Sequence, residues 1–452
     1  MKAMKLQYYA GLWLAAMIFC ACGTRKAAQP QALQPAASEL VNSLTQIQLP
    51  PEEKQIPSGG SEKTPQQNTQ PQLPVAEGWE AELRAALDSL CNNDSLAQTS
   101  QMGIYIHDLT QNTPLYARNA HHRMRPASCQ KVITAVAALH YLGAQHRLRT
   151  TLHMTGQISG TVLKGNLYVV GGMDPTVTAA EVDALVRAVA LAGVRRIQGK
   201  VCKDLGMTDG EPYGWGWCWD DDYGPLSPLL VEGKDRFSAV WMRSMAKHGI
   251  AVSGPDTLVA AACPAEAKQL AAIDHGLEPL LQTMMKESDN IYAESLFYQL
   301  AAHSGKPKAG RKQAALLIGE LMEQAGIKTD ASCVADGSGL SLYNYTTPYI
   351  LASMLQMAHS RPEVYQALLP SLPIAGVDGT LEKRMTEGPA HRRVWAKTGS
   401  VSGVSSLSGY AQAANGHLLA FSIINQGVVR TSHGRKFQDK ICEIMCRGGK
   451  LH

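Results

Sequence analysis

Apolar residues recur every three or four positions in several stretches of the chain, which predicts amphipathic helices. The clearest of these begins just after Pro126. Its apolar positions cover two faces, so we expect a central helix, with Gly143 as its C-cap. On the same ground we expect helices at 79–91, 179–192, 277–285, 291–303, 311–325 and 437–446.

Shorter runs of β-favouring residues predict strands, and turn residues separate them. The expected strands lie at 102–108, 115–118, 149–154, 166–170, 394–397, 407–412 and 418–425. From about residue 266 up to the last three strands we expect helices only. This order of elements predicts an α/β fold of the α+β type, in which helices cover the faces of an antiparallel sheet.

The pattern changes between about residues 147 and 265, where short strands are mixed with helices. We interpret this stretch as a smaller α/β domain inserted into the main fold. Within it, a loop at 214–224 holds three tryptophans and three consecutive aspartates. Two interpretations of this loop stay open: a structural loop with solvated acids, or a wall of a binding site that presents an anion.

The N-terminus predicts export. Residues 1–5 are short and basic, and residues 8–21 are nearly all apolar or small, as in a signal peptide. The stretch ends in a pattern that resembles a bacterial lipoprotein cleavage site, with Cys22 as the lipidated residue of a 1–22 signal. Phe19 stands where leucine is usual, and Cys20 is a competing cysteine. A plain secretory signal is the alternative, and it predicts export as well.

Residues 23–76 hold eight of the chain's 23 prolines and no aromatic residue. Such a composition cannot bury a core, so we expect a disordered Pro/Gln-rich linker. With a lipid on Cys22, this linker would tether the folded part of the protein to a membrane at a distance.

Overall composition narrows the class of protein further. The chain has 452 residues, of which 45% are apolar and 18% charged, as in globular proteins of two or three domains. Its net charge of +4 and the lack of a basic block argue against a nucleic-acid partner. Export would permit disulfides among the ten cysteines, but their pairing cannot be read from the sequence. Because zinc-type cysteine or histidine spacings are missing, we expect no metal.

One short motif carries the chemistry at the start of the central helix. Ser128 and Lys131 lie three residues apart, so a helix places the hydroxyl beside the amine. A helix start also leaves backbone N–H groups free to stabilise an oxyanion. These are the requirements of an acyl-transfer nucleophile. A second match, Ser244 with Lys247, lacks the preceding Pro-Ala and is interpreted as helix surface.

Two further motifs distinguish the first match from chance. Ser288-Asp289-Asn290 and Lys397-Thr398-Gly399 follow Ser128 in that order, and each occurs once in the chain. The three motifs together resemble those of the penicillin-recognising serine enzymes. Cys129, next to the nucleophile, would suggest a thiol enzyme, but the residue after a helix-start nucleophile points elsewhere, and no histidine partner is indicated.

Within that group the chain resembles the D-alanyl-D-alanine carboxypeptidase/endopeptidase family, the DacB-like low-molecular-mass penicillin-binding proteins. The resemblance covers roughly residues 79–446 and is also carried by the stretches 125–128, 171–176, 216–221, 336–341, 376–381 and 403–410. It implies a penicillin-binding transpeptidase-like, or β-lactamase-like, catalytic domain at 77–146 and 266–452. The insertion at 147–265 would be shortened relative to the family, because residues 229–234 run almost directly into the helical stretch at 237–248.

The resemblance also implies roles for individual residues. Ser128 is the nucleophile, Lys131 is its base, kept partly neutral by burial near Lys397, and Ser288 relays a proton to the leaving amine. Asn290 holds the substrate amide. Water then hydrolyses the acyl-enzyme, so the resemblance implies that no cofactor is needed. The substrate-binding strand would be formed by Lys397 and Thr398, which bind the terminal carboxylate, by Gly399, and by Ser400, whose N–H joins that of Ser128 in the oxyanion hole.

One departure from the family concerns the choice of substrate. Leu342 stands where family members commonly have an arginine that grips the carboxylate of a diaminopimelate side chain. Asp221 matches the family acid that meets the amine of the same side chain. We therefore expect the amine contact to persist and the carboxylate contact to be lost.

The expected function is that of a serine D-alanyl-D-alanine carboxypeptidase in the periplasm, with D,D-endopeptidase activity as an additional possibility. Its partners would be peptidoglycan peptides ending in D-Ala-D-Ala, β-lactams as inhibitors and a membrane through the lipid anchor. A serine β-lactamase and a noncatalytic peptidoglycan-binding lipoprotein are the alternatives. The first lacks a Glu-x-x-Leu-Asn segment for deacylation, and the second has no need of an intact Ser128.

Overall fold

The computed structural model describes residues 73–218, 221 and 224–447. The predicted signal peptide with Cys22, and the predicted linker up to residue 72, lie outside these residues. In the part of the chain that the structure describes, no helix is both long and apolar enough to cross a membrane.

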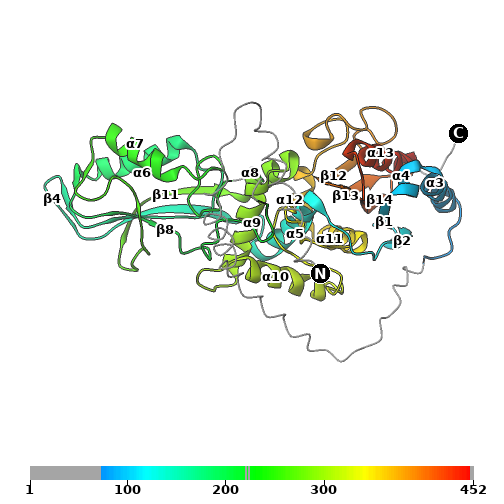
Figure 1. Cartoon of the computed structure of the whole chain (residues 1–452), viewed down its shortest axis with the longest axis horizontal. Helices are drawn as coiled ribbons and strands as arrows, with labels where there is room; N and C mark the ends of the chain where they lie inside the picture. Colours follow the sequence, from blue (N-terminus) through cyan, green and yellow to red (C-terminus); the bar gives the residue numbers. More distant parts are fainter. Residues whose placement is uncertain (1–72, 219–220, 222–223, 448–452) are drawn as a thin grey trace, which may run out of the picture. The chain divides into compact units, whose positions relative to one another are not determined.

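The main sheet joins strands from the two ends of the folded chain (Figure 1). All its pairings are antiparallel, in the order β12-β13-β14-β1-β2, as the order of elements predicts. The strands are β1 (Gln101–Asp108), β2 (Thr113–Arg118), β12 (Val394–Val401), β13 (Val404–Gln412) and β14 (Leu418–Gln426).

Each face of this sheet packs against its own helices, because alternate residues of a strand point to opposite sides. On β14, Ile423 belongs to the core under α3, α4 and α13, whereas Ile424 belongs to the core under α5 and α11 (Figure 1). These helices are α3 (Trp79–Asn93), α4 (Ser95–Thr99), α13 (Thr431–Arg447), α5 (Gln130–Leu142) and α11 (Pro348–His359).

Helices between α5 and β12 in the chain complete the core under α5 and α11. The central helix α5 ends at Gly143, which has a φ of 79° and is the predicted C-cap. Helix α9 is buried along most of its length and packs directly on α5. The remaining elements are α8 (Leu277–Gln282), the π-helix η2 (Thr283–Glu287), α9 (Asn290–His303), α10 (Arg311–Gln324), α12 (Pro362–Leu368) and the 3-10 turns η1 (Ala127–Cys129), η3 (Leu369–Ser371) and η4 (Gly379–Leu381).

Two smaller sheets lie between α5 and α8 in the chain. The first has the order β10-β8-β6-β3-β11, from β3 (Arg147–Met154), β6 (Leu167–Val170), β8 (Val201–Asp204), β10 (Val259–Ala260) and β11 (Lys268–Gly276). The second has the order β4-β5-β7-β9, from β4 (Gln157–Ser159), β5 (Val162–Lys164), β7 (Arg196–Ile197) and β9 (Ala251–Val252). Helices α6 (Ala179–Leu191) and α7 (Phe237–Lys247) supply apolar residues to their common core.

Strand β11 corrects one expectation. The segment from residue 266 does not begin with a helix, since β11 pairs antiparallel with β3 along its whole length. It is the edge strand of its sheet and has one fully buried residue, Ile273. A strand with so little apolar alternation owes its conformation to the pairing with β3.

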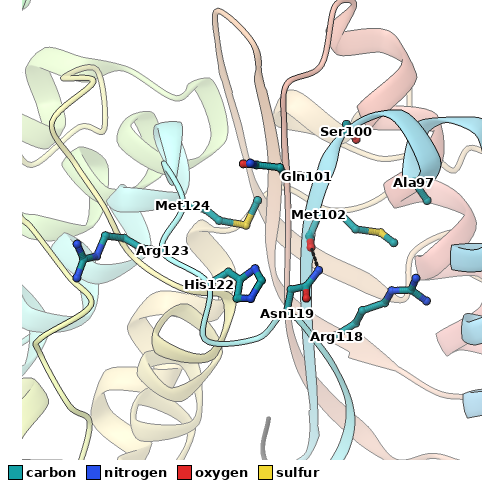
Figure 2. A pocket seen from close by; sticks show the side chains of 9 residues that line it. All are labelled: Ala97, Ser100, Gln101, Met102, Arg118, Asn119, His122, Arg123 and Met124. Atoms are coloured by element: carbon teal, nitrogen blue, oxygen red, sulfur yellow. Dashed lines mark hydrogen bonds between the residues drawn. The ribbon is translucent and has the colours of Figure 1, made fainter. Parts of the chain in front are cut away.

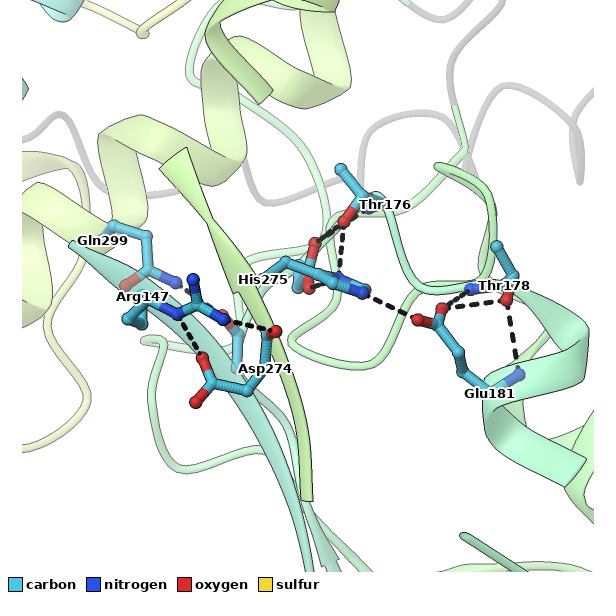
Figure 3. A network of polar contacts seen from close by, with 9 residues as sticks. Arg147, Thr176, Thr178, Glu181, Asp274, His275 and Gln299 are labelled. Carbon is cyan, nitrogen blue, oxygen red and sulfur yellow. Dashed lines mark hydrogen bonds and ion pairs between the residues drawn. The ribbon is translucent and has the colours of Figure 1, made fainter. Parts of the chain in front are cut away.

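A partly exposed polar network around His275 joins β11 to α6 (Figure 3). The His275 ring lies between two carboxylates, with Nδ1 2.7 Å from Asp174 and Nε2 2.7 Å from Glu181. Glu181 also closes a capping box with Thr178 at the start of α6. The pKa of His275 is raised, because the hydrogen bonds and charges of these two acids outweigh its burial. The His275 ring thus connects β11, α6 and the loop around Asp174.

Candidate active site

Ser128 lies in the 3-10 turn that leads into α5, directly beside strand β12. The preceding residue, Ala127, has a φ of 49°, a left-handed conformation that is costly for a residue with a side chain. Gly339 makes room for this turn, because a Cβ there would collide with the carbonyl of Ala127. Gly399 does the same from β12, where it faces Pro126 and Cys129. The turn that carries Ser128 is therefore held by close backbone packing on two sides.

Lys131 lies one helical turn below Ser128 and is fully buried. Its Nζ donates to the Ser128 hydroxyl at 3.1 Å, to Asn290 Oδ1 at 2.6 Å and to the carbonyl of Ser338 at 2.9 Å. Burial lowers the pKa of Lys131 to about 8. The charges of Asp336, Glu294 and Asp289 act in the opposite direction and raise its pKa, but the effect of burial is larger.

Two buried acids hold the turn that receives Lys131. Glu294 accepts the backbone N–H groups of Gly337 and Ser338 on its two oxygens, at 3.2 and 2.9 Å. Asp336 accepts the backbone N–H groups of Gly339 and Ser341, each at 2.7 Å. Burial and the nearby Asp336 raise the pKa of Glu294 to about 8. We did not assign these acids from the sequence. Glu294 follows Asn290 by four residues and Asp336 opens the stretch 336–341, and these positions are the signal that could have indicated them.

Lys397 and Ser288 form the other half of the site. Lys397 Nζ donates to the Ser288 hydroxyl at 2.8 Å and to the carbonyl of Thr398 at 2.9 Å. Burial, with a smaller effect from the charge of Lys131, lowers the pKa of Lys397 well below its usual value. Ser288 lies between η2 and α9 and has a φ of 66°. Like Ala127 before Ser128, it is therefore a residue in the left-handed conformation.

The rest of β12 runs beside the turn that carries Ser128. Thr398 donates to the hydroxyl of Thr380 at 2.8 Å, and Ser400 is exposed to solvent. The thiol of Cys129 is buried and donates to the carbonyl of Lys397 at 3.1 Å. Burial raises its pKa, so this cysteine lies in a packing position and not in that of a nucleophile.

The two positions expected to select the substrate lie on adjoining segments. The Trp217 indole donates to Asp336 at 2.9 Å, and Trp215 packs against Tyr343 at 4.9 Å between ring centroids. Asp221 is half-buried and accepts the backbone N–H of Cys218 at 2.6 Å. The 214–218 part of the tryptophan-rich loop is thus anchored on the 336–343 segment that includes Leu342.

The second Ser-x-x-Lys match has a structural explanation. Ser244 donates to Asp183 at 2.6 Å, and Lys247 forms an ion pair with the same carboxylate at 2.9 Å. Both residues therefore connect α7 to α6 and lie outside the site built around Ser128.

The fold and the pairing of Ser128 with Lys131 define the class of penicillin-recognising serine hydrolases. The model of the D-Ala-D-Ala carboxypeptidase 3 (S13) family matches residues 83–232 and 229–447. The chain belongs to this family.

Curated relatives and solved structures agree with this placement. The chain is 27% identical to the D-alanyl-D-alanine carboxypeptidase DacB of Haemophilus influenzae, over 72% of this chain and 85% of the relative. It is 29% identical to a D-alanyl-D-alanine carboxypeptidase of an Actinomadura species, over 76% and 81%. The crystal structure of H. influenzae penicillin binding protein 4 (dacB) aligns with a TM-score of 0.71 and 25% identity, over 79% of this chain and 97% of that one.

Proposed function

We propose that this protein is a serine-type D-alanyl-D-alanine carboxypeptidase that acts through an acyl-enzyme on Ser128. The observation that carries the proposal is the contact between the Ser128 hydroxyl and the fully buried amine of Lys131, whose pKa is about 8. A lysine with this pKa is partly neutral near pH 7 and can accept the proton of the serine.

The reaction follows from the positions of these groups. Ser128 Oγ bonds to the carbonyl carbon of the penultimate D-Ala while its proton passes to Lys131. The oxyanion lies between the backbone N–H groups of Ser128 and Ser400. The C–N bond then breaks, and the leaving D-Ala amine takes a proton through Ser288. Water hydrolyses the ester and restores Ser128.

Substrate binding is assigned to the remaining residues of the three motifs. Lys397 and Thr398 bind the terminal carboxylate. Lys397 is buried, and no carboxylate of the described residues lies at ion-pair distance from it. The carboxylate of the substrate would supply this missing partner. Asn290 uses its Oδ1 for Lys131 and offers its NH₂ group to the substrate amide. At the upstream side chain, Asp221 would meet an amine, whereas Leu342 supplies no charge for a carboxylate.

Labelled penicillin tests the proposal, since it forms a covalent adduct with a serine of this class. The wild-type chain should be labelled in a one-to-one ratio, and Ser128→Ala should not be labelled at all. Ser244→Ala is the matched control, because it alters the serine of the second Ser-x-x-Lys match. Equal labelling of Ser128→Ala and wild type would refute the nucleophile.

The same site would open a cross-linked peptide, because that bond also joins a D-Ala carbonyl to an amine next to a carboxylate. D,D-endopeptidase activity is therefore a second reaction of the proposed mechanism. Purified cross-linked muropeptide dimers test it, and monomers should appear with the wild-type chain but not with Ser128→Ala.

We also propose a lipid anchor on Cys22. It is supported by the signal-like residues 1–22 and by the small residue before the cysteine. In a bacterial host, wild-type protein should fractionate with membranes, and Cys22→Ala should be released in soluble form. Cys20→Ala is the control. If that variant alone were released, Cys20 and not Cys22 would be the lipidated residue.

A further inference from the structure

A pocket lies beside Thr398 of β12, next to the catalytic groups. It has a volume of about 460 Å³, within the range of about 300–1,000 Å³ that is usual for ligand sites. Its walls come from the turn η4 with the residues that follow it and from the start of α13. Thr380 of η4 lines the pocket and accepts a hydrogen bond from the Thr398 hydroxyl at 2.8 Å. One side chain therefore separates the pocket from β12.

The turn η4 is fixed in place by the segment that carries the second motif. Lys286 forms an ion pair with Asp378, the residue before η4, at 2.6 Å. Asp378 also accepts the backbone N–H of Ile374 at 2.8 Å. Lys286 lies in η2, two residues before Ser288. A ligand at β12 would thus meet a wall that is already formed.

The pocket carries an excess of positive charge. Lys383, Arg384 and Arg435 line it, and Glu382 is its one acidic lining residue. The charge of Arg384 is neutralised by Asp439 at 2.7 Å. Lys383 and Arg435 are exposed, and within the part of the chain that the structure describes neither has an acidic partner at ion-pair distance. These two cations are therefore available to the carboxylates of a ligand.

A second basic pocket does not offer this arrangement. It is lined in part by Arg118 and Arg123, whose guanidinium groups point to opposite sides of it (Figure 2). One donates to the Asn92 side chain and the other to the carbonyl of Asp330. Strand β1, which forms its wall, lies three strands from β12. For a ligand held by β12, the pocket beside Thr398 is the nearer of the two.

The chemistry of the leaving group indicates what the pocket would hold, and this step rests on the proposed function. When the leaving group is free D-Ala, its carboxylate lies at Lys397 and Thr398, and its methyl group needs little room. In a cross-linked peptide, the leaving amine is attached to a carbon that bears the same carboxylate. In place of the methyl group, that carbon carries a chain that leads to a second stem peptide. This chain leaves the site next to the bound carboxylate, where Thr398 contacts Thr380.

We propose that the pocket beside Thr398 is the subsite for the leaving strand of a cross-linked peptidoglycan peptide. Its ligand is an acidic peptide whose side-chain amine forms the scissile bond. Lys383 and Arg435 bind carboxylates of this peptide, and Ser432 bounds the space that it occupies. The pocket lowers KM for the D,D-endopeptidase reaction. It has no part in the release of free D-Ala or in acylation by penicillin.

Cross-linked muropeptide dimers and the monomeric pentapeptide test the charge of this subsite in the full-length chain. In Lys383→Gln combined with Arg435→Gln, kcat/KM for the dimer should fall about tenfold, and D-Ala release from the monomer should not change. Lys436→Gln is the matched control, because it removes an exposed cation of α13 that does not line the pocket. An equal fall for dimer and monomer would overturn the subsite, and so would unchanged cleavage of both.

Filling the pocket gives a second test that does not depend on charge. Ser432→Trp places a large side chain at the wall of the pocket, near the start of α13. It should lose most of its dimer cleavage and release D-Ala from the monomer at the wild-type rate. His433→Trp adds the same bulk at the next exposed position, which does not line the pocket, and should cut dimers normally.

Penicillin labelling separates this subsite from the proposed function, because penicillin carries no leaving strand. Every variant should be labelled at Ser128 at the wild-type rate, which also shows that it folds. A labelled wild-type chain that releases D-Ala but cuts no dimer would overturn the subsite alone. Normal dimer cleavage by the pocket variants would do the same. Absence of labelling in the wild-type chain would overturn the proposed function, and the subsite with it.

Discussion

The backbone carbonyl of Ser338 accepts a hydrogen bond from the amine of Lys131 at 2.9 Å. That carbonyl belongs to a turn that Glu294 and Asp336 hold by four bonds from backbone N–H groups. The position of the proposed base therefore depends on two acids that do not contact Ser128. Their charges also raise the pKa of Lys131 against the larger effect of its burial.

The rate of acylation should rise with pH. The neutral amine of Lys131 accepts the serine proton, and its pKa is about 8, so the rate at pH 7 should be about tenfold below the plateau. Stopped-flow kinetics with a fluorescent penicillin between pH 6 and 9 measures this rise. Lys131→Met, which keeps much of the volume and removes the amine, should lose a factor of about 10³. A flat profile would contradict the assignment of the base.

Replacing Glu294 should change both stability and this pH profile. In Glu294→Gln one acceptor oxygen becomes an NH₂ group that faces a buried backbone N–H, at a cost of about 1–3 kcal/mol in the free energy of unfolding. The ionised form of Glu294 is one of the charges that raise the pKa of Lys131, after Asp336, so its loss should move the midpoint of acylation to lower pH. Urea denaturation and the same penicillin kinetics measure the two effects. Glu320→Gln, exposed on α10, should change neither.

A methyl group at Gly399 should displace the nucleophile. Its Cβ would lie 2.8 Å from the carbonyl oxygen of Pro126 and 3.0 Å from the backbone nitrogen of Cys129, and these atoms flank Ser128. Because small misplacements of reacting groups are costly, Gly399→Ala should acylate about 10²-fold more slowly with an unchanged circular dichroism spectrum. Gly319→Ala on α10 meets open space and should acylate normally. Wild-type rates in Gly399→Ala would show that the turn can shift without loss.

The network around His275 should make stability depend on pH. Its raised pKa means that the charged ring stabilises the fold fully below the unfolded value of about 6.5 and loses this effect as pH rises through the folded pKa. The pKa of Glu181 is lowered, so its contribution is present above about 4.5 and is lost toward more acidic pH. Stability from this network is therefore greatest between about pH 4.5 and 6.5.

Urea denaturation from pH 4 to 9 checks this window. His275→Gln should cost about 1–3 kcal/mol near pH 6 and progressively less as pH rises through the raised pKa of the wild-type ring, because the ring then loses its charge. His433→Gln, exposed on α13, should follow the wild-type curve at every pH. A constant difference between His275→Gln and wild type would mean that the ring acts by packing alone.

The residues of the candidate site could be picked out from the sequence because each motif depends on residues that are close together in the chain. Ser128 and Lys131 meet through helical spacing alone, and the structure brings Asn290 to Lys131 and Ser288 to Lys397. The antiparallel sheet was also predictable, since the order of elements places strands near both ends of the folded chain without the repeated strand-helix-strand pattern of a parallel sheet. The helix α11 was not named, although Thr347 caps it and Pro348 occupies its first turn, which is a readable signal.

Other features could not be predicted because they depend on tertiary contacts. Glu294 and Asp336 are acids in a motif stretch, but only packing shows that both are buried and bound to one turn. Strand β11 has little apolar alternation and is set by its partner β3. The left-handed conformations of Ala127 and Ser288 violate local preference, and the surrounding structure imposes them.

The pairing of β3 with β11 has a consequence for how chains of this kind can diverge. The excursion between residues 155 and 267 leaves the catalytic part on one strand and returns on its antiparallel neighbour. Its two ends are therefore fixed side by side whatever length of chain lies between them. Loop closure depends only weakly on length. Whole segments can therefore be gained or lost inside the excursion during evolution while Ser128 and Ser288 stay equally close in space.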